Sequence, residues 1–243
     1  MGTVLAWCVD RDLLDKDPTR GIEMPAPLAN PKGKQARPPN DAELRDIWTK
    51  AADKLSDQHV RMLRLAFLLG RRASEIAGAA QSELRISGAE PYWLIPPREG
   101  NKSDLPSYVP LPPLALRLIQ DSVRAAADSP WLFPARGKPD TPAMRHGVSQ
   151  AFTDFRREIG ISDQVRLHDV RGLIVDQMLS MGVPSPVISH VLHHTGDMRG
   201  TLAMSVYRTY DMRAEKLRAL RLWQARLHNI VSGRKLHTLR WIA

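Results

Sequence analysis

The clearest structural signal in the chain lies in residues 40–75, NDAELRDIWTKAADKLSDQHVRMLRLAFLLGRRASE. Asn40, followed three residues later by Glu43, forms a capping box, which predicts that a helix begins directly after Asn40. Apolar residues then recur every three or four positions, which indicates one helix to about residue 55 and a second over about 57–69. The second pattern ends at Gly70, a residue type that often terminates helices. This stretch therefore predicts the start of a helical domain.

Most of the remaining chain is also predicted to be helical. A short helix is expected near 73–79, and apolar stripes at helical spacing predict further helices over about 115–126, 142–159, 168–181, 184–192, 200–209 and 211–228. Strands are expected only at Glu83–Ile86, Tyr92–Ile95 and Ser107–Leu111, and the last two form a predicted hairpin with a long polar tip. The predicted fold class is mainly α (α+β), with one small antiparallel β-sheet.

The first part of the chain has a different composition. Residues 3–14 favour a helix, but a lone helix of about twelve residues is marginal in water. Five prolines lie between Met24 and Asn40, which predicts an extended linker. We therefore expect the chain to start inside a domain whose earlier part is absent, with a linker over residues 25–39 and a second domain over 40–243.

The composition of the chain limits the kinds of function that it can have. The chain has 243 residues, with Lys+Arg 35 against Asp+Glu 26, a net charge of +9, and its 43% hydrophobic residues can form a sizeable core. The stretch 195–243 carries ten Arg or Lys against three acidic residues, which favours a polyanionic partner, although a solvated basic face would have the same composition.

Other counts exclude whole classes of protein. The single cysteine, Cys8, excludes an internal disulfide framework and a cysteine-based zinc finger. No apolar run approaches the roughly 18 residues that a membrane span needs, and the N-terminus does not match a signal peptide. These features predict a soluble intracellular protein without a membrane partner.

Two polar clusters lie at predicted helix ends. The first is Gly70-Arg71-Arg72-Ala73-Ser74-Glu75, and the second is Leu167-His168-Asp169-Val170-Arg171. His168 and Arg171 are three residues apart, so we expect both on one face of the first turn of a helix. A helix N-terminus attracts anions, which makes this turn a candidate phosphate site. A capping network around Asp169 explains the same residues equally well.

Two more clusters follow, Val191-Leu192-His193-His194-Thr195-Gly196 and Val206-Tyr207-Arg208-Thr209-Tyr210. Four histidines (His168, His190, His193 and His194) could together form a zinc site. No His-Glu-x-x-His arrangement supports that alternative. A tyrosine in a helical region is, taken alone, usually a packing residue.

The order of these clusters resembles the catalytic domain of the tyrosine recombinases, the phage integrase family. The matching features are Gly-x-Arg-x-x-Glu at 70–75, Lys102 in the predicted hairpin, His-x-x-Arg at 168–171, Leu-x-His at 192–194, and Tyr207 sixteen residues before Trp223. The chain looks closest to bacterial prophage and genomic-island integrases. The resemblance covers essentially the whole chain and implies that residues 1–24 are a remnant of the core-binding domain and that 40–243 are the catalytic domain.

Some positions depart from the family pattern. Gly172-Leu173 stands where relatives usually have Arg-Thr, and His193 replaces a more usual Asn or Gly. Arg71 lies beside Arg72, and only the Gly-x-Arg-x-x-Glu spacing selects Arg72. We expect His194 rather than His193 to be the second catalytic histidine, and Tyr207 rather than Tyr210 to be the nucleophile.

The resemblance implies a DNA strand transferase, a site-specific recombinase that cleaves and rejoins DNA through a 3′-phosphotyrosyl intermediate. No metal, ATP or other cofactor is expected. The phenol of Tyr207 would attack the phosphate, although its reference pKa of about 10 means that it needs help to lose its proton.

The expected helpers are five side chains. Arg72 and Arg171 would stabilise charge on the non-bridging oxygens, because a guanidinium is always charged and presents a planar set of donors. Lys102 would protonate the leaving 5′ oxygen, His168 would accept the Tyr207 proton, and His194 would donate a hydrogen bond to the phosphate. We expect all six side chains to meet around one phosphate.

The expected partner is double-stranded DNA carrying attachment sites. The family also implies a homotetramer on DNA, accessory DNA-bending or directionality proteins, and a location in the bacterial cytoplasm with the DNA. Because one DNA-clamping domain is largely missing, we expect this chain alone to bind DNA weakly and with steep salt dependence. The alternatives are a DNA-binding relative without catalytic activity, a type IB topoisomerase and a zinc hydrolase.

Overall fold

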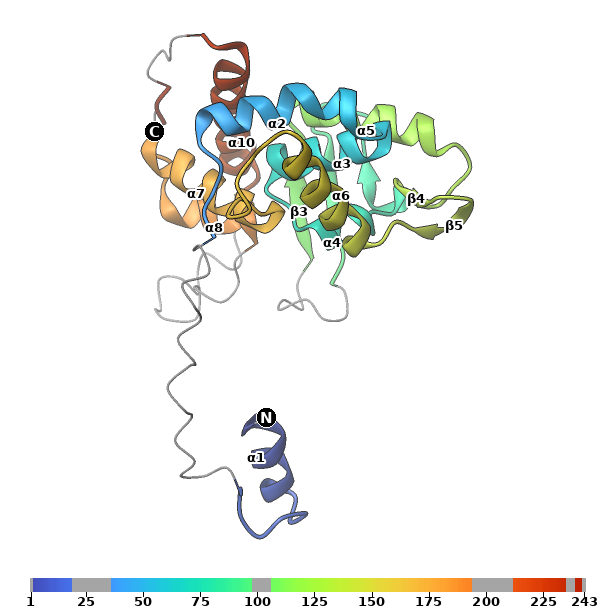
Figure 1. Ribbon diagram of the computed structural model, residues 1–243, viewed down its shortest axis with the longest axis vertical. Helices are drawn as coiled ribbons and strands as arrows, with labels where there is room; N and C mark the ends of the chain where they lie inside the picture. The colour runs from blue at the N-terminus through green and yellow to red at the C-terminus, as the bar shows by residue number, and fades with distance from the viewer. Residues whose placement is uncertain (1, 19–35, 98–105, 194–211, 235–238, 242–243) are drawn as a thin grey trace. The chain divides into compact units, whose positions relative to one another are not determined.

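The computed structural model describes residues 2–18, 36–97, 106–193, 212–234 and 239–241. The chain divides into two compact units, Met1–Gln35 and Ala36–Ala243 (Figure 1). In the first unit, helix α1 spans Gly2–Asp10 and is shorter than predicted, since Asp12 has a φ of 54° that no continuing helix allows. The assignment of residues 1–24 to a core-binding domain stays a prediction.

The second unit begins with the helix pair that the sequence predicts. Helix α2 covers Asp41–Lys54, and its capping box is confirmed, because Asn40 and Glu43 each accept a hydrogen bond from the other's backbone N–H at 2.9 Å. Helix α3 covers Asp57–Leu69, as predicted, and ends at Gly70 with a φ of 62°. A Cβ at Gly70 would lie 2.5 Å from Leu192 Cδ2, so the turn needs glycine for space as well as for conformation.

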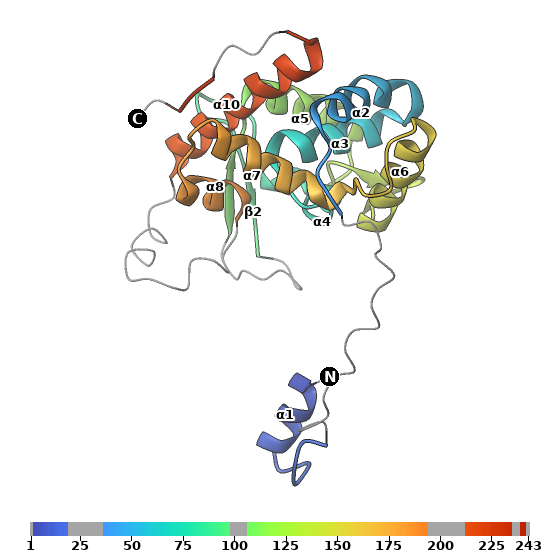
Figure 2. The same cartoon turned by 60° about the vertical axis from the view of Figure 1, so that its left-hand side comes forward.

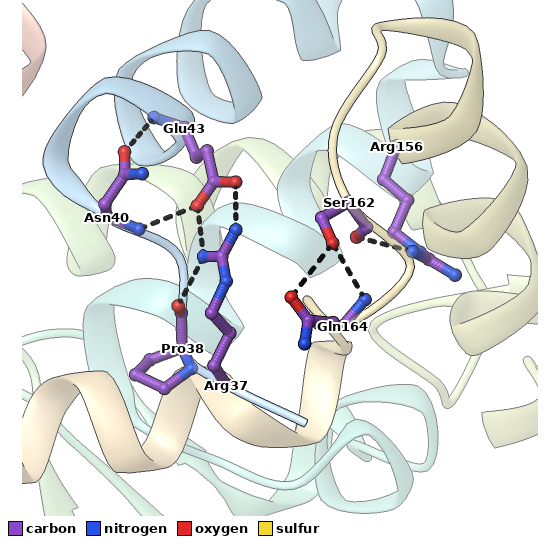
Figure 3. A network of polar contacts seen from close by, with 7 residues as sticks. All are labelled: Arg37, Pro38, Asn40, Glu43, Arg156, Ser162 and Gln164. Carbon is purple, nitrogen blue, oxygen red and sulfur yellow. Dashed lines mark hydrogen bonds and ion pairs between the residues drawn. The ribbon is translucent and has the colours of Figure 1, made fainter. Parts of the chain in front are cut away.

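Polar contacts order the residues before α2 and the loop that precedes the second polar cluster, and Figure 3 shows both groups of contacts. The Arg37 guanidinium donates two hydrogen bonds of 2.6 Å to the Glu43 carboxylate. The backbone N–H of Arg37 donates to the Gln164 carbonyl at 3.0 Å. In the same loop, Arg156 donates to the carbonyl of Ser162 at 2.6 Å. The loop leading to His168 is therefore held on two sides.

The predicted three-stranded sheet is present. Strands β1 (Leu84–Arg85), β2 (Tyr92–Ile95) and β3 (Ser107–Pro110) form an antiparallel sheet in that order. Trp93 pairs with Val109 on β3 and is 1% exposed, and its indole donates to Glu83 at 2.8 Å. Strand β3 starts directly after the part of the hairpin that lies outside the described residues.

The mainly α fold class is confirmed, but the prediction of a single sheet was wrong. Strands β4 (Pro134–Ala135) and β5 (Lys138–Pro142) form a second antiparallel pair around Gly137. Three of these positions are proline, which lacks the backbone N–H donor, and β5 is mostly exposed and has no apolar alternation. The usual strand signals are therefore absent from this segment.

Helices make up most of the rest of the second unit. Their bounds are α4 (Ala73–Ala77), α5 (Pro113–Ala126), α6 (Arg145–Glu158), α7 (Val170–Ser180), α8 (Ser185–Leu192) and α10 (Arg213–Ser232), with 3₁₀ turns η1 (Gln81–Glu83) and η2 (Leu167–Asp169). The predicted helix over 200–209 lies outside the described residues. In the described part of the chain, no helix has both the length and the apolar character of a membrane span.

Helix α3 forms the centre of the core. All but five of its residues are buried, and it packs against α2, α5, α6, α7 and α10. Trp223 on α10 is fully buried, and its indole donates to the carbonyl of Phe67 on α3 at 2.8 Å. Helix α10 also packs on α8 and on β3, and Figure 2 shows α10 beside α8.

Candidate active site

The Gly-x-Arg-x-x-Glu motif forms the tight turn between α3 and α4. Gly70 provides the left-handed conformation, Arg72 is the N-cap of α4, and Glu75 is the third residue of that helix. The Glu75 carboxylate accepts from the backbone N–H of Arg72 at 2.8 Å and from its Nη1 at 3.1 Å. The motif's spacing therefore has a geometric cause, since the glutamate holds both the turn and the arginine side chain.

Arg171 on α7 lies against this turn. Its Nη1 donates to the Gly70 carbonyl and its Nη2 to the Leu192 carbonyl, each at 2.6 Å. These two bonds connect Arg171 to residues that lie 101 and 21 positions from it in the sequence. The structure thus brings Arg171 and the Arg72 turn together at the end of α8.

His168 occupies a different environment from Arg171. It is exposed and lies in the η2 turn, whereas Arg171 is 6% exposed. The expected start of a helix at 168 is thus a 3₁₀ turn, and α7 begins at Val170. Asp169 is the N-cap of α7 but makes no side-chain capping bond, and its buried Oδ2 accepts no hydrogen bond within the described ranges. The capping-network alternative is therefore not supported.

His193 ends α8 in the left-handed conformation, with φ 53° and ψ 48°. Asn and Gly adopt this conformation most readily, which gives a physical reason for their usual presence at this position. Burial, followed by the charge of Arg71, lowers the pKa of His193 to about 4. His193 is therefore neutral at pH 7.

The charges of the cluster act on one another. The pKa of the Glu75 carboxyl is lowered, since the charges of Arg71 and Arg72 and its backbone hydrogen bond outweigh the effect of burial, which would raise it. Burial, with the like charges of Arg71 and Arg72, lowers the pKa of Arg171 to about 9, so the guanidinium stays charged at pH 7. Among the described side chains, three guanidinium groups surround one carboxylate, an arrangement suited to an anion.

Three predicted site residues (Lys102, His194 and Tyr207) lie outside the described residues, as does the competing Tyr210. The structure does describe residues next to two of them. Ser107 opens the strand after the Lys102 hairpin, and its hydroxyl accepts from Arg71 at 3.0 Å. His193 directly precedes His194, and its pKa responds to the charges of Arg71, Glu75 and Arg72. Both flanking segments therefore reach the arginine cluster.

The Gly-x-Arg-x-x-Glu motif assigns no role to Arg71, although this side chain is only 2% exposed. The Arg71–Arg72 doublet was visible, but spacing alone cannot show that the first arginine points inward. Lys216 is a further neighbour of the site, and it donates to the Tyr108 carbonyl on β3 at 2.8 Å. Within the described ranges, no group of three His, Cys, Asp or Glu side chains could hold a metal ion.

Comparison with known proteins gives a consistent picture. The chain is 28% identical over 143 residues to the tyrosine recombinase XerD of Rhizobium meliloti (strain 1021), a match covering 55% of this chain and 42% of that protein. The chain thus spans less than half the length of this relative.

Solved structures share the fold. The integrase from mycobacterium phage Brujita matches with a TM-score of 0.59 at 16% identity, over 90% of this chain and 67% of the other. The Tn1549 transposon integrase in complex with transposon right end DNA matches with a TM-score of 0.61 at 11% identity, over 85% of this chain and 75% of the other. The sequence profile of the phage integrase family matches residues 40–222. That range includes the Arg72 turn, the Arg171 helix and the end of α8, and the chain therefore belongs to the phage integrase family.

Proposed function

We propose that this chain carries the DNA-breaking and DNA-rejoining centre of a site-specific tyrosine recombinase, an integrase. The observation that carries the proposal is the pair of bonds by which Arg171 contacts the Arg72 turn, at the Gly70 carbonyl, and the end of α8, at the Leu192 carbonyl. Two arginines that are held by the protein itself form a preorganised site for a phosphate whose oxygens gain charge during the reaction.

Among the described residues, the bonds of the two arginines use only some of their donors. A guanidinium has five N–H groups, and the two carbonyl bonds of Arg171 use two of them. The side chain of Arg72 is 30% exposed and makes one bond to Glu75, so it can turn its other donors outward. In this proposal, both arginines bind the non-bridging oxygens of the scissile phosphate.

In the proposed reaction, the energy of the cleaved phosphodiester bond is kept in a covalent bond between protein and DNA. The Tyr207 oxygen attacks phosphorus, a 3′-phosphotyrosyl bond forms, and the bond from phosphorus to the 5′ oxygen breaks. His168, which is exposed, accepts the phenol proton, and Lys102 gives a proton to the leaving 5′ oxygen. His194 donates a hydrogen bond to the phosphate. The same groups in reverse allow the 5′-hydroxyl of another strand to attack the intermediate.

The partner in this proposal is double-stranded DNA with attachment sites. The basic excess of the chain supports it, and so does the binding of related integrases to DNA, including the lambda integrase dimer bound to a COC′ core site. A homotetramer on DNA, accessory DNA-bending or directionality proteins, and a location with the DNA in the bacterial cytoplasm complete the proposal. No metal or ATP is required.

Covalent trapping tests the proposal without knowledge of the target sequence. The chain is incubated with random-sequence duplexes that carry one nick. Cleavage near the nick releases a short strand, which diffuses away, so its 5′-hydroxyl cannot attack and reverse the phosphotyrosyl bond. Adducts that survive detergent are recovered and sequenced to define a single suicide substrate. We expect adducts with the unaltered chain and with Tyr210→Phe, and none with Tyr207→Phe.

Two results would oppose the proposal. DNA binding without any adduct would favour a relative without catalytic activity. Relaxation of supercoiled DNA with no strand exchange between recovered sites would favour a type IB topoisomerase.

A further inference from the structure

Arg71 makes an unusual set of contacts for a charged side chain. It is 2% exposed, and its guanidinium donates to three different segments. Nε donates to the Leu69 carbonyl at 3.4 Å, Nη1 to the Ser107 hydroxyl at 3.0 Å, and Nη2 to the Val191 carbonyl. One side chain therefore links the end of α3, the start of β3 and the end of α8.

Two of these segments lie next to predicted catalytic residues in the sequence. Ser107 is the first residue of β3 and follows Lys102 by five positions, and Val191 precedes His194 by three. The third segment leads directly into Arg72. Resting on the proposed function, we propose that Arg71 is a positioning residue: it holds the start of β3, which follows Lys102 in the sequence, and the end of α8, which precedes His194, against the Arg72 turn.

The end of α8 explains why two arginines are found here. The last carbonyls of a helix have no partner within the helix, and the helix dipole places negative charge at that end. Arg71 donates a hydrogen bond to the Val191 carbonyl, and Arg171 donates one to the Leu192 carbonyl. The two guanidinium groups therefore cap α8 together and fix its C-terminal end, where His193 directly precedes His194 in the sequence.

An apolar side chain at position 71 could fill the space but could not make these bonds. Burying a guanidinium next to two others is unfavourable unless it is well hydrogen-bonded, and Glu75 supplies one compensating charge. A lysine would keep the charge but not the planar arrangement of donors that reaches three acceptors at once. The residue type thus favours a geometric role over a purely electrostatic one.

The test compares Arg71→Met, Arg71→Lys and a matched control, Arg64→Met. Arg64 is a half-buried arginine on α3 whose guanidinium lies over the Trp48 ring at 5.3 Å and donates to the Trp48 carbonyl at 3.4 Å, so its described interactions are with α2. For each variant, the single-turnover rate of adduct formation is measured at saturating protein on the suicide substrate, and the DNA Kd is measured separately. All measurements are made well below the Tm of every variant.

We expect Arg71→Met to lower the single-turnover rate by about 100-fold, since a displacement of about 1 Å at a reacting group has an effect of that size. The DNA Kd should change by less than about 3-fold, because the residues exposed to DNA are retained. Arg71→Lys should recover part of the rate, and Arg64→Met should keep the full rate. An unaltered rate in Arg71→Met, or an equal loss in Arg64→Met, would overturn the proposal.

Hydrogen–deuterium exchange provides a readout that does not depend on activity. In Arg71→Met, exchange should rise in the peptides that contain Ser107 and Val191, and stay unchanged in α2. If the unaltered chain forms no adduct, the proposed function fails, while this exchange result still decides whether Arg71 holds the two segments. If Arg71→Met does not fold, Arg71→Lys and Ser107→Ala replace it. An unaltered rate in both would overturn the proposal.

Discussion

Replacing His193 with asparagine should change how the stability of the protein depends on pH. His193 has a pKa of about 4 in the folded protein, against an ordinary value of 6.5. Between these two values the unfolded chain binds a proton that the folded protein does not bind. The free energy of unfolding therefore falls as the pH is lowered from 6.5 to 4. Above pH 6.5 His193 is neutral in both states, and the stability that it contributes is fully present. Asparagine has no such proton, so His193→Asn should lose less stability over the same range.

The size of the effect follows from the shift. A pKa difference from 6.5 to about 4, at 1.36 kcal/mol per unit, corresponds to at most about 3 kcal/mol. His193 is partly exposed, so solvent screening reduces this to roughly 1–2 kcal/mol. The left-handed conformation at φ 53° adds a term independent of pH, because asparagine tolerates it better, by a few tenths of a kcal/mol to about 1 kcal/mol.

The assay is urea unfolding of the unaltered chain and His193→Asn at pH 7.5, 6.5, 5.5 and 4.5. Subtracting the two curves removes contributions that both proteins share, such as that of Glu43, whose pKa is lowered by its hydrogen bonds to Arg37. His228→Asn, at an exposed position on α10, shows the effect of replacing any histidine. The difference between unaltered chain and His193→Asn should widen steadily as the pH falls below 6.5. A difference that stays constant with pH would refute the reasoning.

Three further predictions concern packing and DNA binding. Gly70→Ala should destabilise the protein by about 2 kcal/mol in urea unfolding, since its Cβ would meet Leu192 Cδ2 at 2.5 Å in a left-handed turn, and wild-type stability would contradict this. Trp223→Phe should lose about 2 kcal/mol, because it leaves a cavity and removes the donor from the Phe67 carbonyl; a Tm within one degree of the unaltered chain would show that the bond contributes little. DNA binding by this chain should be weak and should fall steeply between about 50 and 200 mM salt. Nanomolar binding that resists salt, measured by fluorescence anisotropy, would contradict the last prediction.

Local signals were sufficient to predict most helices. The capping box at Asn40 and the terminating Gly70 bracket α2 and α3, and both helices occur with the predicted limits. The apolar run Tyr92–Ile95 located β2 as well, and the structure adds that Trp93 and Ile95 are buried while Leu94 is exposed. The β4–β5 pair could not be predicted in this way, since its exposed, proline-containing strands are specified by pairing with each other and not by a buried face.

The site could be predicted only in part from the sequence. The motif spacing selected Arg72 and Arg171, but the carbonyls that hold Arg171 belong to Gly70 and Leu192, and no local pattern encodes a bond between such distant segments. The same limit hid the buried position of Arg71. The 3₁₀ turn before α7 separates an exposed His168 from a buried Arg171, which an expectation of one continuous helix could not anticipate.

The most direct test of the central claim is to identify the residue that becomes joined to DNA. The trapped adduct is digested with nuclease and protease, and the peptide carrying a nucleotide remnant is sequenced by mass spectrometry. We predict that the peptide contains Tyr207 and that the nucleotide remnant is joined to its phenol oxygen. A remnant on Tyr210, on a serine or on a histidine would contradict the account, as would an adduct that still forms with Tyr207→Phe.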